Sequence, residues 1–217
     1  MAVRREGTGW TPSGTRRVHS RGRLATAILA LGLTACVGLP PVPPPGVDTE
    51  QLWEARRAQL DTLRRWSLVG RVAVNGDGES WSSHVRWVQH DDDYEIDFST
   101  FLGQRVAQVT GRAGDVTLSL PGREPVTAAS AAQLLTKVFG WQMPVESLRY
   151  WVVGLPVPGE ARERSIDGMG RLQELRQDGW HVSYAEYGEG GQGLPRRFVV
   201  TDSQWQIRVV VDEWNTG

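Results

Sequence analysis

The sequence predicts a mainly β fold with a few helices (α+β), built around one curved antiparallel sheet. Apolar and polar residues alternate over many short runs, which is the period of half-buried strands. Tight turns such as Asn75-Gly76-Asp77-Gly78 join consecutive runs and favour antiparallel neighbours. The 25 glycines and 10 tryptophans favour turns and large apolar surfaces over a helical bundle. An open sheet of about ten strands tends to curl, so we expect helices on its concave side to cover an apolar cavity.

Residues 1–35 have the features of a lipoprotein signal peptide. A basic segment containing Arg16, Arg17, Arg21 and Arg23 precedes an apolar stretch over residues 24–33. That stretch is shorter than the roughly 20 residues of a membrane-spanning helix. It ends in Leu33-Thr34-Ala35, directly before Cys36, the only cysteine of the chain. This pattern is a bacterial lipobox, and it predicts that Cys36 is acylated and begins the mature protein. An ordinary signal peptide beside a chance cysteine is the alternative.

The mature chain divides into a short attachment segment and one domain. Residues 36–47 comprise the acylated cysteine and a tether with five prolines, and residues 48–217 form a single binding domain. The full chain has a formal net charge of −1. Removal of the signal peptide leaves 18 basic and 24 acidic residues, a charge near −6. This charge excludes a nucleic-acid interface, and it leaves membrane attachment to acyl chains.

The periodicity places helices around and between the strands. A first helix is expected from Asp48 or Thr49 to about Arg65, with Trp53, Leu60 and Leu63 on one stripe. Two further helices are expected over Thr127–Phe139 and Val145–Val153, between two groups of strands. The expected strands are Trp66–Val74, Trp81–Gln89, a pair within Tyr94–Val109, Val116–Leu120, Gly170–Arg176, Trp180–Tyr187, Arg196–Thr201 and Gln204–Asp212.

Two large apolar residues occupy the connection within Tyr94–Val109. Phe101 and Leu102 stand directly before Gly103, where a solvent-facing turn is normally polar. One interpretation is that the connection folds back and buries both side chains. The other is that both are exposed in order to contact lipid. The sequence alone leaves both interpretations open.

The alternating aromatic and aliphatic residues also predict the lining of the cavity. The aromatic residues exceed what a small tight core fills comfortably, and two amphipathic segments are available to cover them. Each aromatic residue taken alone is more typical of a packed core. We expect Trp151 to close the cavity, and we expect the lining to consist of Trp66, Trp87, Ile96, Phe98, Leu118, Trp151, Trp180, Tyr184, Ile207 and Val209.

No motif indicates catalysis. The segment Gly188–Gly193 matches G-x-G-x-x-G but leads into Leu194-Pro195 and a strand, so we interpret it as a loop. His90 precedes three aspartates without a second histidine at ligand spacing, which is typical of a solvated turn. The sequence contains no nucleophile motif or P-loop. We therefore expect no enzymatic activity, no cofactor and no metal.

Several blocks in order along the chain resemble the LolB family of outer-membrane lipoprotein receptors of Gram-negative bacteria. Besides the lipobox Leu33–Cys36, the blocks are Trp66–Val74, Trp87-Val88-Gln89, Phe101-Leu102-Gly103, Met143-Pro144-Val145, Leu148–Pro156, Gly179–Tyr184, Leu194-Pro195 and a final strand that ends at Trp214. The resemblance covers essentially the whole mature domain.

The resemblance implies a fold, a function and partners. The fold would be an incomplete antiparallel β-barrel whose helices cover an apolar cavity for acyl chains. The function would be that of a lipid-anchored receptor at the periplasmic face of the outer membrane. It would accept cargo lipoproteins from the periplasmic carrier LolA and insert them among the phospholipids of the inner leaflet. Leu102 matches an exposed leucine needed for membrane insertion, and Phe101 replaces a common proline.

Other classes of function remain open at this point. The chain is expected to be a monomer. One alternative is a structural envelope lipoprotein whose sheet is packed solid. Another is a periplasmic lipid-binding carrier without transfer activity, although a carrier of that type would lack Cys36. Binding of an acylated ligand separates the binding proteins from the structural one.

Overall fold

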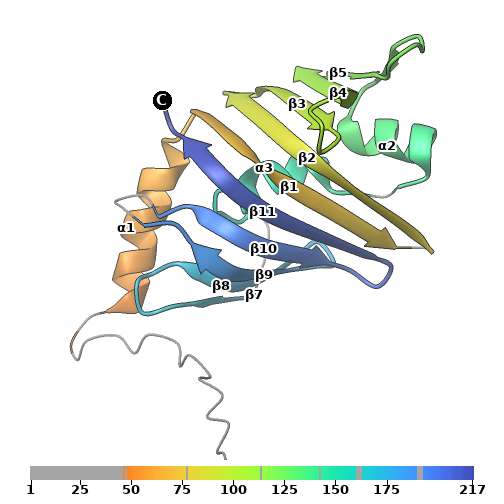
Figure 1. Ribbon diagram of the computed structural model, residues 1–217. Helices are drawn as coiled ribbons and strands as arrows, with labels where there is room; N and C mark the ends of the chain where they lie inside the picture. The colour runs from red at the N-terminus through yellow and green to blue at the C-terminus, as the bar shows by residue number, and fades with distance from the viewer. Residues whose placement is uncertain are drawn as a thin grey trace, which may run out of the picture. The chain divides into compact units, whose positions relative to one another are not determined.

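The computed structural model describes Gly46 and residues 48–76, 78–112, 114–141, 143–159, 163–189 and 193–217. In this part of the chain one 11-stranded antiparallel sheet has the order β6-β5-β4-β3-β2-β1-β11-β10-β9-β8-β7 (Figure 1). The outermost strands, β6 and β7, do not pair, so the sheet is not closed and the predicted fold class is confirmed. The strands are β1 (Arg65–Gly76), β2 (Glu79–His90), β3 (Asp93–Ser99), β4 (Arg105–Arg112), β5 (Asp115–Ser119), β6 (Val126–Ala128), β7 (Glu163–Ile166), β8 (Leu172–Gln177), β9 (Trp180–Tyr187), β10 (Pro195–Thr201) and β11 (Trp205–Asn215).

The centre of the sheet joins the two ends of the domain. β1 pairs with the C-terminal strand β11 along nearly its whole length, and a bulge interrupts the register between Val69 and Gly70. A Cβ atom added to Gly70 would lie 2.2 Å from the carbonyl oxygen of Val210. Glycine is therefore required where the two backbones approach most closely.

Helix α1 (Thr49–Asp61) begins where the sequence predicts. The Asp48 carboxylate accepts hydrogen bonds from the backbone N–H groups of Glu50 and Gln51, at 2.9 and 3.4 Å. Trp53 and Leu60 are buried on one face. The helix ends at Asp61, four residues before the expected Arg65, because β1 begins at Arg65 and the chain needs Thr62–Arg64 to turn.

The helix expected over Thr127–Phe139 is only partly helical. Its first residues belong to β6, which pairs with β5, and the helix α2 covers Ala131–Phe139. Ser130 caps α2 by accepting a hydrogen bond from the backbone N–H of Gln133, so the helix begins after the serine. Helix α3 covers Val145–Trp151. It ends two residues before the expected Val153, because Val152, Val153 and Gly154 form a turn in which Gly154 has φ +84°.

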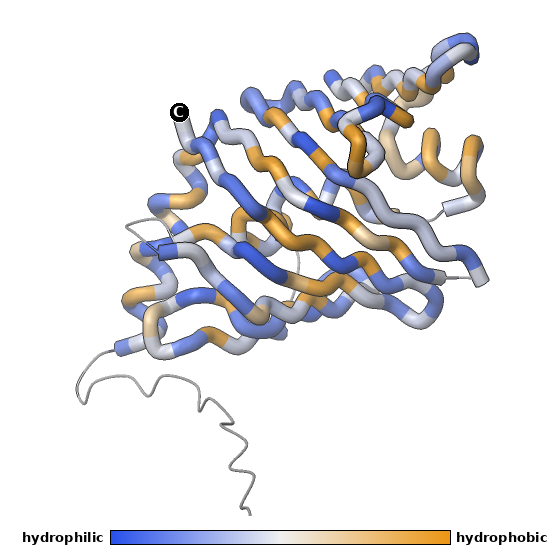
Figure 2. Tube along the Cα trace, in the orientation of Figure 1, coloured by the Kyte–Doolittle hydropathy of each residue, from blue (hydrophilic) through white to orange (hydrophobic). Residues whose placement is uncertain are grey.

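The second group of strands also differs from the expectation. β7 was not expected, because Glu-Arg-Ser-Ile lacks the alternation of a half-buried strand and lies at the sheet edge. β8 begins at Leu172 rather than Gly170, since residues 167–171 make the turn between β7 and β8. Hydropathy alternates along most strands, as Figure 2 shows. Within the described residues no helix is long and apolar enough to cross a membrane. The expected signal peptide, Cys36 and, apart from Gly46, the tether lie outside the described residues.

Candidate functional site: an apolar cavity and an exposed hairpin tip

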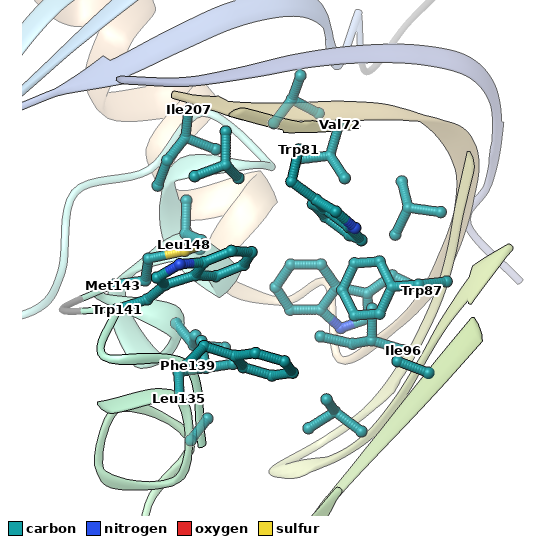
Figure 3. Close-up of a pocket in the computed structure, with 18 of the residues that line it drawn as sticks. Val72, Trp81, Trp87, Ile96, Leu135, Phe139, Trp141, Met143, Leu148 and Ile207 are labelled. Atoms are coloured by element: carbon teal, nitrogen blue, oxygen red, sulfur yellow. The ribbon is translucent and has the colours of Figure 1, made fainter. Parts of the chain in front are cut away.

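A cavity of about 300 Å³ lies on the inner face of the first half of the sheet. Every residue that lines it is apolar. Figure 3 shows Trp81, Trp87 and Ile96 from the strands facing Phe139, Trp141, Met143 and other residues of the helical side. The strands β1 to β5, β10 and β11 contribute Leu68, Val72, Val74, Trp81, Val85, Trp87, Ile96, Phe98, Val106, Ala107, Val109, Leu118, Phe198, Ile207 and Val209. The segment from Leu120 to Val152, including α2 and α3, contributes Leu120, Ala131, Leu134, Leu135, Phe139, Trp141, Met143, Val145, Leu148 and Val152.

The structure brings together six of the ten residues that the sequence assigns to the lining. They come from β2, β3, β5 and β11, and they lie together because the strands of this part of the sheet present alternate residues to the same face. These six residues are Trp87, Ile96, Phe98, Leu118, Ile207 and Val209.

The other four residues, Trp66, Trp151, Trp180 and Tyr184, lie outside the lining. Trp66 packs between Trp87 and Trp214, with ring centroids 5.3 and 5.5 Å away. Trp180 is half-buried at the start of β9 and packs against the core. Both residues have the expected alternation, but alternation does not show which part of a long sheet is hollow.

Trp151 does not close the cavity. It is completely buried, and its indole Nε1 donates a hydrogen bond of 3.2 Å to the side chain of Gln177. The Tyr184 hydroxyl donates to the carbonyl oxygen of Trp151 at 2.8 Å, which ties the end of α3 to β9. These contacts fill the space beside β8 and β9, so the hollow is confined to the part of the sheet formed by β1 to β5, β10 and β11.

A buried amide fixes the tryptophan at the base of the cavity. Trp87 Nε1 donates to Gln89 Oε1 at 3.1 Å. The Gln89 amide nitrogen donates in turn to the carbonyl oxygens of Asp91 and Asp93, at 2.8 and 3.3 Å. Asp91 has φ +54°, and the two bonds from Gln89 hold the turn between β2 and β3. The only polar atom of Trp87 is thereby satisfied, and its ring can face the cavity without a polar cost.

Aromatic residues that the sequence did not assign to the site form a second wall. The ring of Trp81 lies 5.3 Å from that of Phe98 and 5.8 Å from that of Trp141, and Phe139 lies 5.1 Å from Trp141. Trp81 shares the strand face of Trp87, so its alternation could have identified it. Trp141 and Met143 stand between α2 and α3, where the sequence has no periodic signal.

The connection between β3 and β4 is a three-residue turn that exposes its apolar residues. Thr100 N–H donates to the carbonyl of Gln104, and Gly103 N–H donates to the carbonyl of Thr100, both at 2.9 Å. Gly103 has φ +79°, as the third residue of this turn type requires. Phe101 and Leu102 occupy the two central positions and are 83% and 80% exposed. The interpretation that the connection folds back and buries them is therefore wrong.

The ionisable groups near the cavity do not suggest chemistry. No cluster of three or more His, Cys, Asp or Glu side chains suited to a metal occurs among the residues that the structure describes. Burial raises the pKa of Tyr94 to about 12. Burial also raises the pKa of Tyr184 and of Tyr187 above the usual value. These hydroxyls stay neutral at ordinary pH, and that of Tyr184 is engaged by backbone.

An open antiparallel sheet with a wholly apolar cavity defines a class of β protein with space for an apolar ligand. The family model described as "Outer membrane lipoprotein LolB" matches residues 64–214. The chain therefore belongs to the LolB family of outer-membrane lipoproteins. Both the family and the outer-membrane location predicted from the sequence are confirmed.

The relatives cover most of the chain. The outer-membrane lipoprotein LolB of Nitrosococcus oceani is 36% identical over 195 residues, which are 88% of this chain and 97% of the relative. That of Pseudomonas putida strain F1 is 38% identical over 170 residues, covering 78% and 83%. A putative outer-membrane lipoprotein-sorting protein domain of Vibrio parahaemolyticus is similar in structure. Its TM-score is 0.52 at 10% identity, over 77% of this chain and 93% of that domain, which supports the fold alone.

Proposed function

We propose that the cavity receives the acyl chains of lipoproteins delivered by the periplasmic carrier LolA, and that the β3–β4 turn helps to pass them into the inner leaflet of the outer membrane. As a member of the LolB family, the chain is a receptor of the lipoprotein localisation pathway and not an enzyme. The identity of the carrier, the route of the cargo and the residues involved are what we propose.

The observation that carries this proposal is the apolar character of the cavity. A volume of about 300 Å³ is at the lower end of the roughly 300–1,000 Å³ range of ligand pockets. A lining without charged residues, in which tryptophan indoles are the only polar side-chain groups, favours a hydrocarbon ligand, because a polar ligand would lose most of its hydration without replacement. Each Å² of apolar surface removed from water contributes about 25 cal/mol. An acyl chain is the lipoprotein component that matches such a lining.

The exposed turn supports delivery to a membrane. Burial of one leucine or phenylalanine side chain in an apolar medium contributes roughly 1.5–3 kcal/mol. Phe101 and Leu102 together would therefore favour transient insertion into a bilayer without anchoring the domain. Stable anchoring would come from acyl chains on Cys36, joined to the domain through the tether of residues 37–47.

Transfer must proceed downhill in binding free energy. The sequence has no nucleotide-binding motif, so the receptor would have to bind the acyl chains more tightly than the carrier does. A difference of ~1.4 kcal/mol gives a tenfold bias. The bilayer would in turn be the most favourable environment for the chains.

Filling the cavity tests its assigned role. Ala107 lines the cavity from β4, and the next residue, Gln108, points to the other face of the strand. Ala107→Trp should greatly weaken binding of a fluorescent diacylated peptide, because the indole occupies the space of the ligand. Gln108→Trp adds the same group on the opposite face and should bind normally. Equal binding by two folded variants, as judged by thermal melts, would contradict the assignment and favour a structural lipoprotein.

A further inference from the structure

A second hairpin has the same turn geometry as the β3–β4 tip. Between β7 and β8, Asp167 N–H donates to the carbonyl of Arg171 at 2.8 Å, and Gly170 N–H donates to the carbonyl of Asp167 at 3.0 Å. Gly170 has φ +69°, as Gly103 does at +79° in the first turn. The middle position, taken by Leu102 in the first turn, is taken here by Met169.

Met169 is exposed although several hydrogen bonds hold its turn. Asp167 is buried, and its carboxylate accepts hydrogen bonds from the backbone N–H groups of Met169 and Arg171, both at 2.9 Å. The Arg171 guanidinium also binds that carboxylate, at 2.7 Å. Among the described residues, Phe101, Leu102 and Met169 are the large apolar side chains more than half exposed, at 83%, 80% and 60%. All three stand in central positions of this turn type, where small or polar residues are usual.

The β7–β8 turn lies against the helix through which the tether enters the domain. A Cβ atom on Gly170 would meet the backbone of Leu52 and Trp53 at 2.6 Å. Leu52 is 37% exposed, so it extends the apolar surface of Met169 on α1. Leu52 lies one helical turn after Asp48. Eleven residues separate Asp48 from Cys36, and this length of chain spans at most roughly 40 Å.

The two turns lie at opposite ends of the strands. The β3–β4 turn is at the end of the sheet where β1 ends, because β3 runs parallel to β1. The β7–β8 turn is at the end of the sheet where β1 begins, because β7 runs in the direction opposite to β1. In Figure 1 this second end is the one beside α1. A flat bilayer therefore contacts one turn or the other.

We propose that Met169 and Leu52 form a second lipid-contacting surface, which rests on the bilayer near the anchor while the Phe101–Leu102 tip faces away from it. The proposal rests on acylation of Cys36, which holds this end of the sheet within reach of the membrane. In this orientation the tip is free of lipid, and the domain must turn over to present it. The receptor would thus have a resting contact with the membrane at one end of the sheet and a delivery contact at the other end.

Site-specific fluorescence tests this surface in the full lipidated chain. Met169→Cys, Leu102→Cys and Val69→Cys variants are labelled with an environment-sensitive fluorophore in vesicles of phosphatidylethanolamine and phosphatidylglycerol. Acylation of Cys36, checked by its acyl mass, removes the native thiol from the reaction. Val69 is an exposed apolar residue in the middle of β1 and is the matched control. We expect the label at 169 to shift its emission to shorter wavelength and to lose intensity to spin-labelled lipid, while the label at 69 does neither.

Two results would overturn the proposal. One is a label at 169 that responds to lipid no more than the label at 69. The other is a label at 169 that responds only when the carrier is added, which would make this surface a protein contact. Uptake of acylated cargo, measured on the same samples, shows independently whether the receptor function is intact.

Discussion

At the residue scale, two buried glutamines hold the tryptophans around which the interior is arranged. Gln177 accepts hydrogen bonds from Trp151 Nε1 at 3.2 Å and from the backbone N–H of Val157 at 2.9 Å, and it donates to the Val157 carbonyl at 3.0 Å. One side chain thereby ties the end of α3 and the following loop to β8. Gln89 performs the corresponding task for Trp87 at the base of the cavity.

Gln177→Leu should lower the free energy of unfolding by about 1–3 kcal/mol. The leucine fills a similar space but leaves the buried indole N–H of Trp151 unpaired. Gln133→Leu, on the exposed side of α2, is the control and should change stability by less than about 0.5 kcal/mol. Urea denaturation of the three proteins measures the difference, and equal midpoints for all three would contradict this role of Gln177.

Tyr94 should make the fold sensitive to alkali. Its pKa is raised by burial from 10.0 to about 12, so the folded protein retains the phenolic proton at a pH where the unfolded chain loses it. Linkage then requires stability to be fully present below pH 10 and to fall as the pH rises from 10 to about 12. Tyr94→Phe keeps the ring over Gly111 and should make this fall shallower. Identical alkaline unfolding profiles for the wild type and the variant would refute the assignment.

Single residues were predictable from the sequence where periodicity alone decides their position. Trp87 and Phe98 were assigned correctly to the cavity face because strand alternation fixes their direction. Trp151 and Tyr184 were misplaced, because their burial depends on Gln177 and on the contact between α3 and β9. Such long-range contacts leave no local pattern in the sequence.

At the scale of elements, the β3–β4 hairpin has the clearest functional design. Its ladder fixes the turn type, and the turn type fixes the exposure of the two central residues. The sequence identified the two apolar residues but left open whether they are exposed. The hydrogen bonds of Thr100 decide this point, since a three-residue turn cannot fold its central side chains back onto the sheet.

Leu102→Glu should leave folding and uptake of cargo unchanged while blocking delivery to membranes. Leu102 is 80% exposed, so its removal costs little packing, whereas a carboxylate opposes insertion of the tip into hydrocarbon. Gln104→Glu adds the same charge to the same turn without removing an apolar side chain, and it should deliver normally. Liposome delivery and thermal melts are measured on both variants. Normal delivery by stably folded Leu102→Glu would rule out this role of the tip.

At the scale of the whole molecule, function depends on a sheet whose two halves differ. The part formed by β1 to β5 and β11, with Phe198 of β10, stays hollow under α2 and α3, whereas Trp53, Trp151 and Tyr184 fill the space at β7 to β9. The sequence predicted an open curved sheet with covering helices. It could not predict that the hollow is confined to one half, because both halves have the same alternation. The division arises from α1, which packs against the β7–β8 turn and Tyr187 of β9, and from the end of α3, which is bonded to β8 and β9.

The proposed function requires that this hollow take acyl chains from a carrier and release them to a bilayer. The most direct measurement follows an acylated lipoprotein, initially bound to purified LolA, after addition of the lipidated receptor and liposomes without nucleotide. We expect the cargo to move first to the receptor and then to the liposomes. Ala107→Trp should stop the first step and Leu102→Glu the second. Cargo that stays on the carrier in the presence of the folded wild-type receptor would contradict the claim.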